Sequence, residues 1–149
     1  MRAFVRIGLV SALALVASST APSAQAPPPP PAYQIVVRPS SPVTTLDRRF
    51  LEDAFLKKIK TWPNGEAIRP VALEPRSPVR RRFTEEVLRR PLEAVRAYWQ
   101  QRIFSGRDVP PPELAGDEAV LRYVMKYPGA IGYVSRNAAL NGAKAVSMN

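Results

Sequence analysis

The residues best suited to chemistry lie close together, where Arg76 and Arg80 flank the triplet Ser77, Pro78 and Val79. Serine is a favoured N-cap and proline favours the first helical position, so the triplet predicts the start of a helix. The free amides of such a start, two guanidinium groups and a hydroxyl together suit an oxyanion. Arg76, Ser77 and Arg80 are therefore our candidate ligand-binding residues. The alternative is an ordinary capped helix whose arginines keep the domain soluble.

Few residues in the sequence could carry out catalysis or hold a metal. The chain has no histidine and no cysteine, which removes the commonest general base, the commonest metal ligand and the best nucleophile. Two pairs of neighbouring acids, at 85–86 and 117–118, could serve as acid and base, but such pairs on helix faces are ordinarily solvated. We therefore expect a protein that is not an enzyme, with no catalytic residue, no metal site and no cofactor.

The first 26 residues have the three parts of a secretory signal peptide. Two arginines come first, an uncharged apolar run follows at 7–16, and small residues end the segment. The run is shorter than a membrane-spanning helix, which needs about 20 residues, although an uncleaved anchor is the alternative. We expect cleavage near Ala26, or earlier after Ser19 because Pro27 would hinder the later cut. The mature protein is then expected in a bacterial periplasm.

The charge of the chain suggests an anionic neighbour. Two of the 22 lysines and arginines lie in the first 26 residues, so 20 basic and 12 acidic residues remain, a net charge of +8. Export removes most opportunities to meet nucleic acid, so we expect no nucleic-acid partner. Phosphate or another oxyanion, an acidic protein or another envelope component remain as partners that charge alone does not separate.

A proline-rich spacer at 27–32 is expected to precede one domain at 33–136, followed by a tail at 137–149. Without cysteine there is no disulfide, so the domain must be stabilised by its apolar core. Alternating and helical spacings predict a succession of elements. The predicted strands are 35–37, 67–73 and 130–134, and the predicted helices are 46–58, one from 78, one from 91, and 117–126.

Strands and helices alternate in this prediction, which indicates an α/β fold. If the first two strands are parallel neighbours, the helix between them crosses over right-handed. The tail either adds a final strand or remains loose. Thr44 or Thr45 is expected to cap the first helix, and the arginines at 80–82 to lie on the outer face of the second. In the third, Ile103 is expected to face inward. Trp62 either anchors its turn or offers a stacking platform to a sugar.

Three stretches resemble the phosphate-binding proteins of phosphate ABC transporters, members of the type 2 periplasmic binding protein superfamily. Val43–Trp62 is similar to the family's helix and following turn, and Ile68–Phe83 to its strand, ligand loop and helix start. Pro128–Val134 is similar to its terminal strand. The resemblance covers residues 33 to about 136 and corresponds to one lobe of a two-lobed family. It implies a single-lobe α/β fold, with a small mixed or mostly parallel sheet flanked by helices.

The same resemblance implies a function. In the family an anion is held between two lobes, and this lobe contributes a loop with an arginine, an aspartate and a Ser-Gly-Thr sequence. Ser77 matches that serine. The other four positions differ from the pattern and hold Leu73, Pro75, Pro78 and Val79. We expect a substrate-binding-protein-like domain that binds phosphate or another oxyanion weakly, and whose pairing as a homodimer would rebuild a cleft. The alternative is an envelope protein-interaction module that has lost ligand binding.

Overall fold

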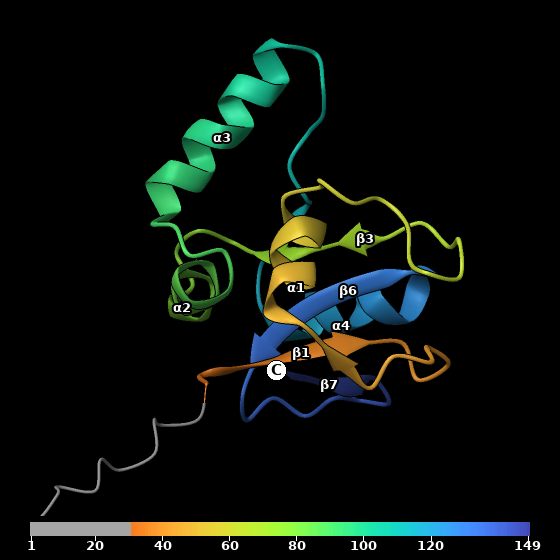
Figure 1. The fold of residues 1–149 in the computed structure, drawn as a ribbon. Helices are drawn as coiled ribbons and strands as arrows, with labels where there is room; N and C mark the ends of the chain where they lie inside the picture. The colour runs from red at the N-terminus through yellow and green to blue at the C-terminus, as the bar shows by residue number, and fades with distance from the viewer. Residues whose placement is uncertain (1–30) are drawn as a thin grey trace, which may run out of the picture.

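The computed structural model describes residues 31–149 (Figure 1). The predicted signal peptide, and all but the last two residues of the predicted spacer, lie outside this part of the chain. Strands and helices are interspersed along the described residues, which confirms the predicted α/β class. No helix between residues 31 and 149 is both long and apolar enough to cross a membrane.

Five strands form one sheet, and they are β1 Tyr33–Val37, β2 Thr45–Leu46, β3 Arg69–Pro70, β6 Ala130–Ser135 and β7 Lys144–Met148. Their order is β2-β7-β1-β6-β3. β1 is antiparallel to β6 and β7, whereas β2 is parallel to β7 and β3 is parallel to β6. The sheet is therefore mixed. The condition for a right-handed crossover between the first two predicted strands is not met, because β6 lies between β1 and β3.

A second, two-stranded ladder continues from this sheet. Its parallel strands are β4 Ala72–Leu73 and β5 Glu113–Leu114. β4 follows β3 after a single residue, Val71, whose N–H donates to the carbonyl of Ile131 at 2.9 Å. The predicted strand at 67–73 is thus two short strands with different neighbours. β5 was not predicted, because it lies in a segment whose prolines and glycines indicate a loop.

The four helices are α1 Arg48–Phe55, α2 Pro78–Val87, α3 Leu92–Phe104 and α4 Asp117–Lys126. α2 begins as predicted, with Ser77 as its N-cap and proline in its first turn. α4 has the predicted bounds, and its buried residues are Val120, Leu121 and Val124. Both predictions depend on signals within a few residues of each other, namely capping and helical spacing.

The start of α1 differs from the prediction. Asp47 is the N-cap, and its carboxylate accepts a hydrogen bond from the N–H of Arg49 at 2.7 Å. Thr45 belongs instead to β2 and pairs with Ser147 of β7, a partner at the far end of the chain that local spacing does not reveal. The helix ends at Phe55, since Lys57 has a left-handed backbone with φ of 52° that a helix cannot continue.

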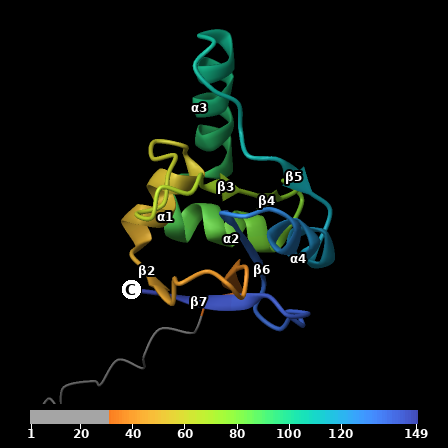
Figure 2. The same ribbon diagram turned by 90° about the vertical axis from the view of Figure 1, so that its right-hand side faces the viewer.

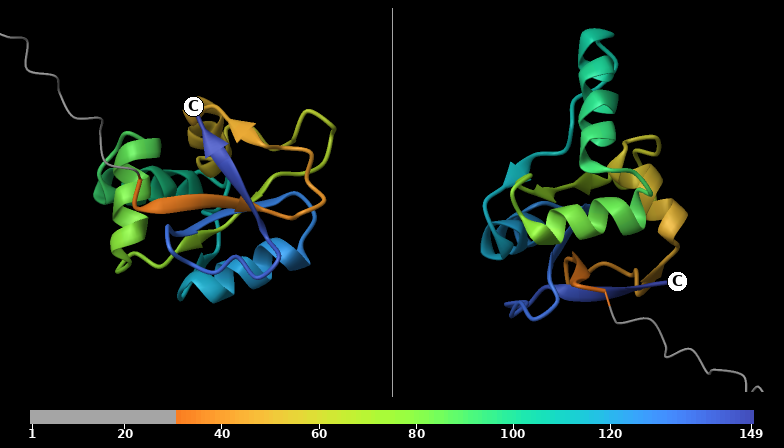
Figure 3. Two further views of the ribbon diagram at one scale, coloured as in Figure 1. Left: turned by 90° about the horizontal axis from the view of Figure 1, so that it is seen from below. Right: turned by 90° about the vertical axis from the view of Figure 1, so that its left-hand side faces the viewer.

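Apolar side chains pack on both faces of the sheet. Gly132 and Tyr133 are neighbours in β6, so they face opposite sides. A Cβ added at Gly132 would lie 2.7 Å from Val120 Cγ1 of α4. Tyr133 stacks on Phe83 of α2 with ring centroids 3.8 Å apart, and its ring centroid lies 5.7 Å from that of Phe55 in α1. α4 therefore covers one face of the sheet, and α1 and α2 cover the other (Figure 3).

α3 stands away from the rest of the domain (Figures 1 and 2). Its first half is attached, because Val95 and Trp99 are buried and the hydroxyl of Tyr98 donates to a carbonyl at the end of α1 at 2.8 Å. Its last turn extends beyond these contacts, and Ile103 is 52% exposed. The prediction that Ile103 faces inward is wrong, because the apolar stripe continues along the helix after the body of the domain has ended.

The C-terminal tail adds a strand, which was one of the two alternatives. β7 lies between β1 and β2, and its Val146 is buried. Val146 is paired with Ile35 and Lys144 with Val37, both in β1. Residues 144–148 therefore form an inner strand of the sheet.

Candidate functional site

The start of α2 lies at an edge where two parallel strands end. β4 ends at Leu73 and β5 at Leu114, and α2 and α4 begin a few residues later. The N–H of Glu74 donates to the carbonyl of Leu114 at 3.0 Å, so the two loops are joined. In the right-hand view of Figure 3 both helices start on the side where β5 ends. The carboxyl ends of parallel strands and the adjoining helix starts are a common place for ligands in α/β folds.

Arg80 does not lie on the outer face of α2, which corrects the prediction. It is only 8% exposed, and its Nη1 donates to the carbonyl of Leu73 at 2.7 Å. Its Nη2 donates to Glu113 Oε1 at 3.2 Å. One guanidinium therefore contacts both strands of the β4-β5 ladder. The reason is position, because residue 80 faces back toward β4 and an arginine there is long enough to reach both strands.

The buried environment of Arg80 includes Tyr133. The hydroxyl of Tyr133 accepts a hydrogen bond from the N–H of Leu73 at 3.3 Å. Burial raises the pKa of Tyr133 to about 12, although the positive charge of Arg80 acts in the opposite direction. The phenol is therefore neutral at physiological pH and serves as a hydrogen-bond acceptor in the core.

Ser77 has the capping role that the sequence predicts. Its Oγ accepts a hydrogen bond from the N–H of Arg80 at 3.3 Å, and its carbonyl accepts one from the N–H of Arg81 at 3.2 Å. Pro78 has no N–H to offer. The cap thus occupies part of the hydrogen-bonding capacity that a helix start can present to an anion.

Arg76 is the most accessible of the three predicted site residues. Its side chain is 87% exposed, and its Nη2 lies 3.3 Å from Glu74 Oε2. Together with Pro78 and Glu85, Arg76 lines an open hollow of about 380 Å³, whose other members are Arg81 and Arg82. Sequence reasoning placed these last two on the outer face of the helix but did not connect them with Arg76. The sequence signal that could have found Arg81 and Arg82 is their short separation from Ser77, which marks the helix start.

The neighbouring acids Asp117 and Glu118 have structural contacts. Asp117 accepts a hydrogen bond from the N–H of Ser135 at 2.9 Å, which ties the start of α4 to the end of β6. Glu118 forms an exposed ion pair with Arg122 at 3.4 Å. Within residues 31–149, no group of three or more acids is placed to hold a metal ion.

Trp62 anchors its turn, which is the first of its two predicted roles. It is 6% exposed, and its Nε1 donates to the carbonyl of Gly129 at 3.0 Å. Its ring stacks on Phe50 with centroids 5.3 Å apart. Because the ring is packed inside, it has no free face for a sugar.

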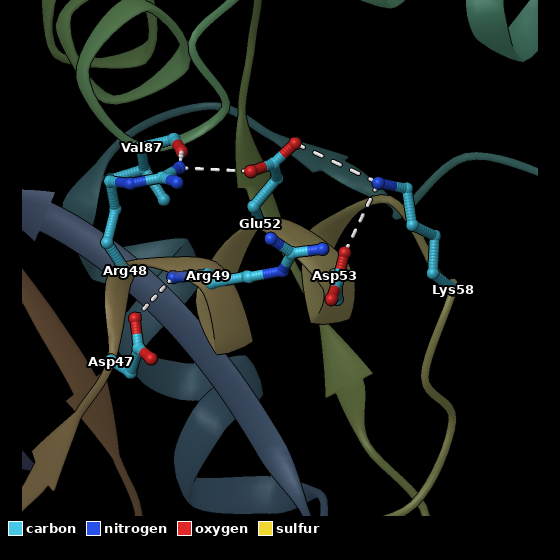
Figure 4. A network of polar contacts seen from close by, with 7 residues as sticks. All are labelled: Asp47, Arg48, Arg49, Glu52, Asp53, Lys58 and Val87. Carbon is cyan, nitrogen blue, oxygen red and sulfur yellow. Dashed lines mark hydrogen bonds and ion pairs between the residues drawn. The ribbon is translucent and has the colours of Figure 1, made fainter.

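A polar network joins α1 to the end of α2 (Figure 4). Nη1 of Arg48 donates to the carbonyl of Val87 at 2.6 Å and to Glu52 Oε2 at 3.0 Å. Nζ of Lys58 lies 3.2 Å from Asp53 Oδ1 and 3.8 Å from Glu52 Oε1. Arg48, Glu52, Asp53 and Lys58 each face an opposite charge or a carbonyl. These contacts therefore fasten α1 to the end of α2.

No model of a protein family matches the sequence, and no curated protein sequence matches it either. Similarity appears in three dimensions, where the chain has an α/β fold like that of a single lobe of solved periplasmic binding proteins. This result confirms, for the fold, the resemblance carried by the three sequence stretches.

The matching structures are binding proteins for phosphate transport. PstS from Borrelia burgdorferi superposes with a TM-score of 0.62 at 14% identity, over 79% of this chain and 47% of that chain. An ABC-type phosphate transport receptor from Vibrio cholerae gives 0.56 at 19% identity, over 78% and 46%. A phosphate ABC transporter substrate-binding protein from Clostridium perfringens, solved with bound phosphate, gives 0.61 at 21%, also over 78% and 46%. This chain therefore spans less than half the length of each.

Proposed function

We propose that this chain is a non-enzymatic, single-lobe relative of phosphate-binding proteins that binds phosphate or a similar oxyanion weakly at the start of α2. The observation that carries the proposal is the hollow beside the first turns of α2, which Arg76, Arg81 and Arg82 line together with Pro78 and Glu85. Guanidinium groups and a helix N-terminus both favour an anion. The similarity in fold to proteins of phosphate transport also favours an oxyanion as the ligand.

The roles of the predicted site residues differ within this proposal. Arg76 supplies an exposed charge, and Ser77 fixes the helix start beside it. Arg80 acts indirectly, because its guanidinium is already bonded to Leu73 and Glu113 and holds the loop in place. Arg81 is the additional residue that we assign to the ligand.

The affinity should be low. The hollow is open to solvent, and this chain has no second lobe within its described residues to enclose the anion. An exposed anion remains hydrated and is screened by salt. We therefore expect millimolar dissociation constants that weaken as the salt concentration rises, with sulfate as an effective competitor.

Calorimetric titration with phosphate tests the proposal, with sulfate for comparison and at low and physiological salt. The Arg76→Ala and Arg81→Ala double variant should lose the heat of binding. Arg122→Ala is the control, because it removes another largely exposed arginine, from α4, and it should bind like the wild type. Absence of any heat with the wild-type protein at millimolar phosphate would reject this function.

The second candidate is an interaction module that has lost its ligand. It is favoured by the contacts of Arg80 and Ser77, whose polar side-chain atoms form hydrogen bonds within the fold itself. In that case the basic surface meets an acidic protein of the cell envelope. A domain that shows no phosphate binding, yet binds an acidic polypeptide such as polyglutamate through the same arginines, supports this alternative.

We further propose that the protein is exported to the periplasm after cleavage near Ala26. The sequence pattern of residues 1–26 supports this location, as does the similarity to binding proteins of ABC transporters. N-terminal sequencing of protein recovered from a periplasmic fraction would test it. An intact first residue, or recovery only from the cytoplasm, would contradict it.

A further inference from the structure

Three of the five large apolar side chains that are exposed within residues 31–149 lie at the end of α3 or just after it. Phe104 is 94% exposed, Val109 59% and Ile103 52%. We use "α3 tip" for these three residues with Arg102 and Arg107. Single exposed apolar side chains are ordinary on protein surfaces, but neighbouring ones on a projecting element mark a contact site.

The α3 tip is held in place by the contacts behind it. Tyr98 is bonded to α1, and the guanidinium of Arg102 lies 5.2 Å from the centre of its ring. Arg102 is therefore partly covered. The loop that returns from the tip is fastened too, because Asp108 lies 3.4 Å from Lys57 Nζ and 2.8 Å from Lys60 Nζ. Phe104 is thus presented outward by a helix with a fixed position.

The charge of the α3 tip defines what can contact it. The tip contains two arginines, Arg102 and Arg107, and no acid lies between them in the sequence. The next acid, Asp108, is already paired with two lysines. A contacting surface must therefore be anionic and must also accept apolar side chains. A second copy of this chain is a poor match, since its own net positive charge would repel the first.

We propose that the α3 tip is a peripheral membrane-binding site for anionic lipid. The tip is convex, and a bilayer can surround a convex apolar point without a preformed pocket. Phe104 and Ile103 would enter the boundary between headgroups and acyl chains, while Arg107 would contact lipid phosphates. A single small anchor of this kind gives weak, reversible binding that depends on anionic lipid. The proposal is independent of oxyanion binding at α2.

A fluorescent label beside Phe104 tests the insertion directly. The chain has no cysteine, so Ser105→Cys provides a unique attachment site for an environment-sensitive dye. Vesicles of phosphatidylglycerol and phosphatidylethanolamine should shift its emission to the blue, and vesicles of phosphatidylcholine should not. A dye at Ser147→Cys is the control, because β7 lies at the opposite end of the molecule (Figures 1 and 2). Vesicle binding through the N-terminal segment would leave the dye at residue 105 in water.

Substitutions in the labelled chain separate the tip from the rest of the surface. Ile103→Ser with Phe104→Ser should reduce vesicle partitioning by about tenfold or more. Met125→Ser, which removes an exposed apolar side chain from α4, should leave it unchanged. Melting temperatures of all variants should match, because these side chains are exposed.

Three results would overturn the proposal. The first is an unchanged dye signal with anionic vesicles, and the second is a shift that survives the double substitution at the tip. The third is a concentration-dependent dimer, seen by light scattering, that the double substitution abolishes. That last result would assign the tip to contact between two copies of the chain.

Discussion

Arg80 of α2 and Glu113 of β5 join two elements that are far apart in the sequence, with Nη2 of the arginine 3.2 Å from Oε1 of the glutamate. The other terminal nitrogen of Arg80 donates to the carbonyl of Leu73. The guanidinium is nearly buried, whereas the Glu113 side chain is 41% exposed. The bond to Leu73 is therefore the larger contribution to stability, because loss of a partner costs more for a buried group than for a hydrated one.

Arg80→Ala should lower the free energy of unfolding by roughly 2 kcal/mol, as it leaves the Leu73 carbonyl unpaired and a cavity beside Tyr133. Urea unfolding measures this change. Arg81→Ala is the control, with an expected change within about 0.5 kcal/mol because its side chain is exposed. Equal effects of the two substitutions would mean that Arg80 is not a structural residue.

Ser77→Ala should reduce stability by about 1 kcal/mol through loss of the N-cap. Ser77→Asp should retain the cap, since aspartate caps helices as well as serine does. Its negative charge should nevertheless repel an oxyanion at the same helix start. Paired urea unfolding and phosphate titration can therefore separate the two roles of this position. Phosphate binding by Ser77→Asp at wild-type strength would place the anion elsewhere.

Gly132→Ala should destabilise the domain by about 1–3 kcal/mol through overpacking. The added Cβ would lie 2.7 Å from Val120 Cγ1 and 2.9 Å from Val71 Cγ1, closer than carbon atoms can approach. Combining it with Val120→Ala makes room for the new methyl group. The double variant should then be more stable than the sum of the single effects predicts, which a double-mutant cycle measures. Simple additivity would contradict the close contact between β6 and α4.

Asp108 should make the domain less stable in acid. Its hydrogen bond with Lys60 is the main cause that lowers its pKa from 3.8 to about 2, with help from the N–H of Val109 and from Lys57. A carboxyl with a lowered pKa in the folded state contributes stability above its unfolded pKa, and this is lost as pH falls toward the folded value. The contribution should be about 1 kcal/mol or less, because Lys60 is largely exposed.

Urea unfolding of the wild type and Asp108→Asn across acidic pH tests this prediction. The difference between the two proteins should be constant above about pH 5 and should shrink as the pH falls to about 2. Comparing two proteins cancels the titration of the other acids. A difference that does not change with pH would exclude the ion pairs of Asp108 as its source.

Local signals predicted the elements whose ends depend on neighbours in sequence. Ser77 and Pro78 marked the start of α2, and helical spacing gave α4, because capping and periodicity act within a few residues. Arg80 was misplaced because Glu113, its partner, is 33 positions away in a two-residue strand. Ile103 was misplaced because an apolar stripe does not indicate where the body beneath a helix ends.

The sequence predicted the helix start at which the candidate site lies, but it did not predict which arginines there face solvent. Arg76 and Ser77 lie at a helix start at the end of a β-strand, as the resemblance implies. Which arginines face solvent depends on β5, which pairs with β4. The sequence does not reveal β5, because it directly follows a run of prolines. Of the three arginines expected on the outer face of α2, Arg81 and Arg82 lie there and Arg80 does not.

The place of β1 in the sheet has a consequence for how the protein is made. β1 is the first described strand to be synthesised, yet its two neighbours, β6 and β7, are the last. Pairing between strands that are so far apart in the sequence is slow, because a long loop must close before any stabilising contact can form. Until then Tyr33–Val37 is an apolar strand with two open edges, the kind of segment that aggregates. In the growing chain this strand therefore stays without its partners until β6 and β7 have been synthesised.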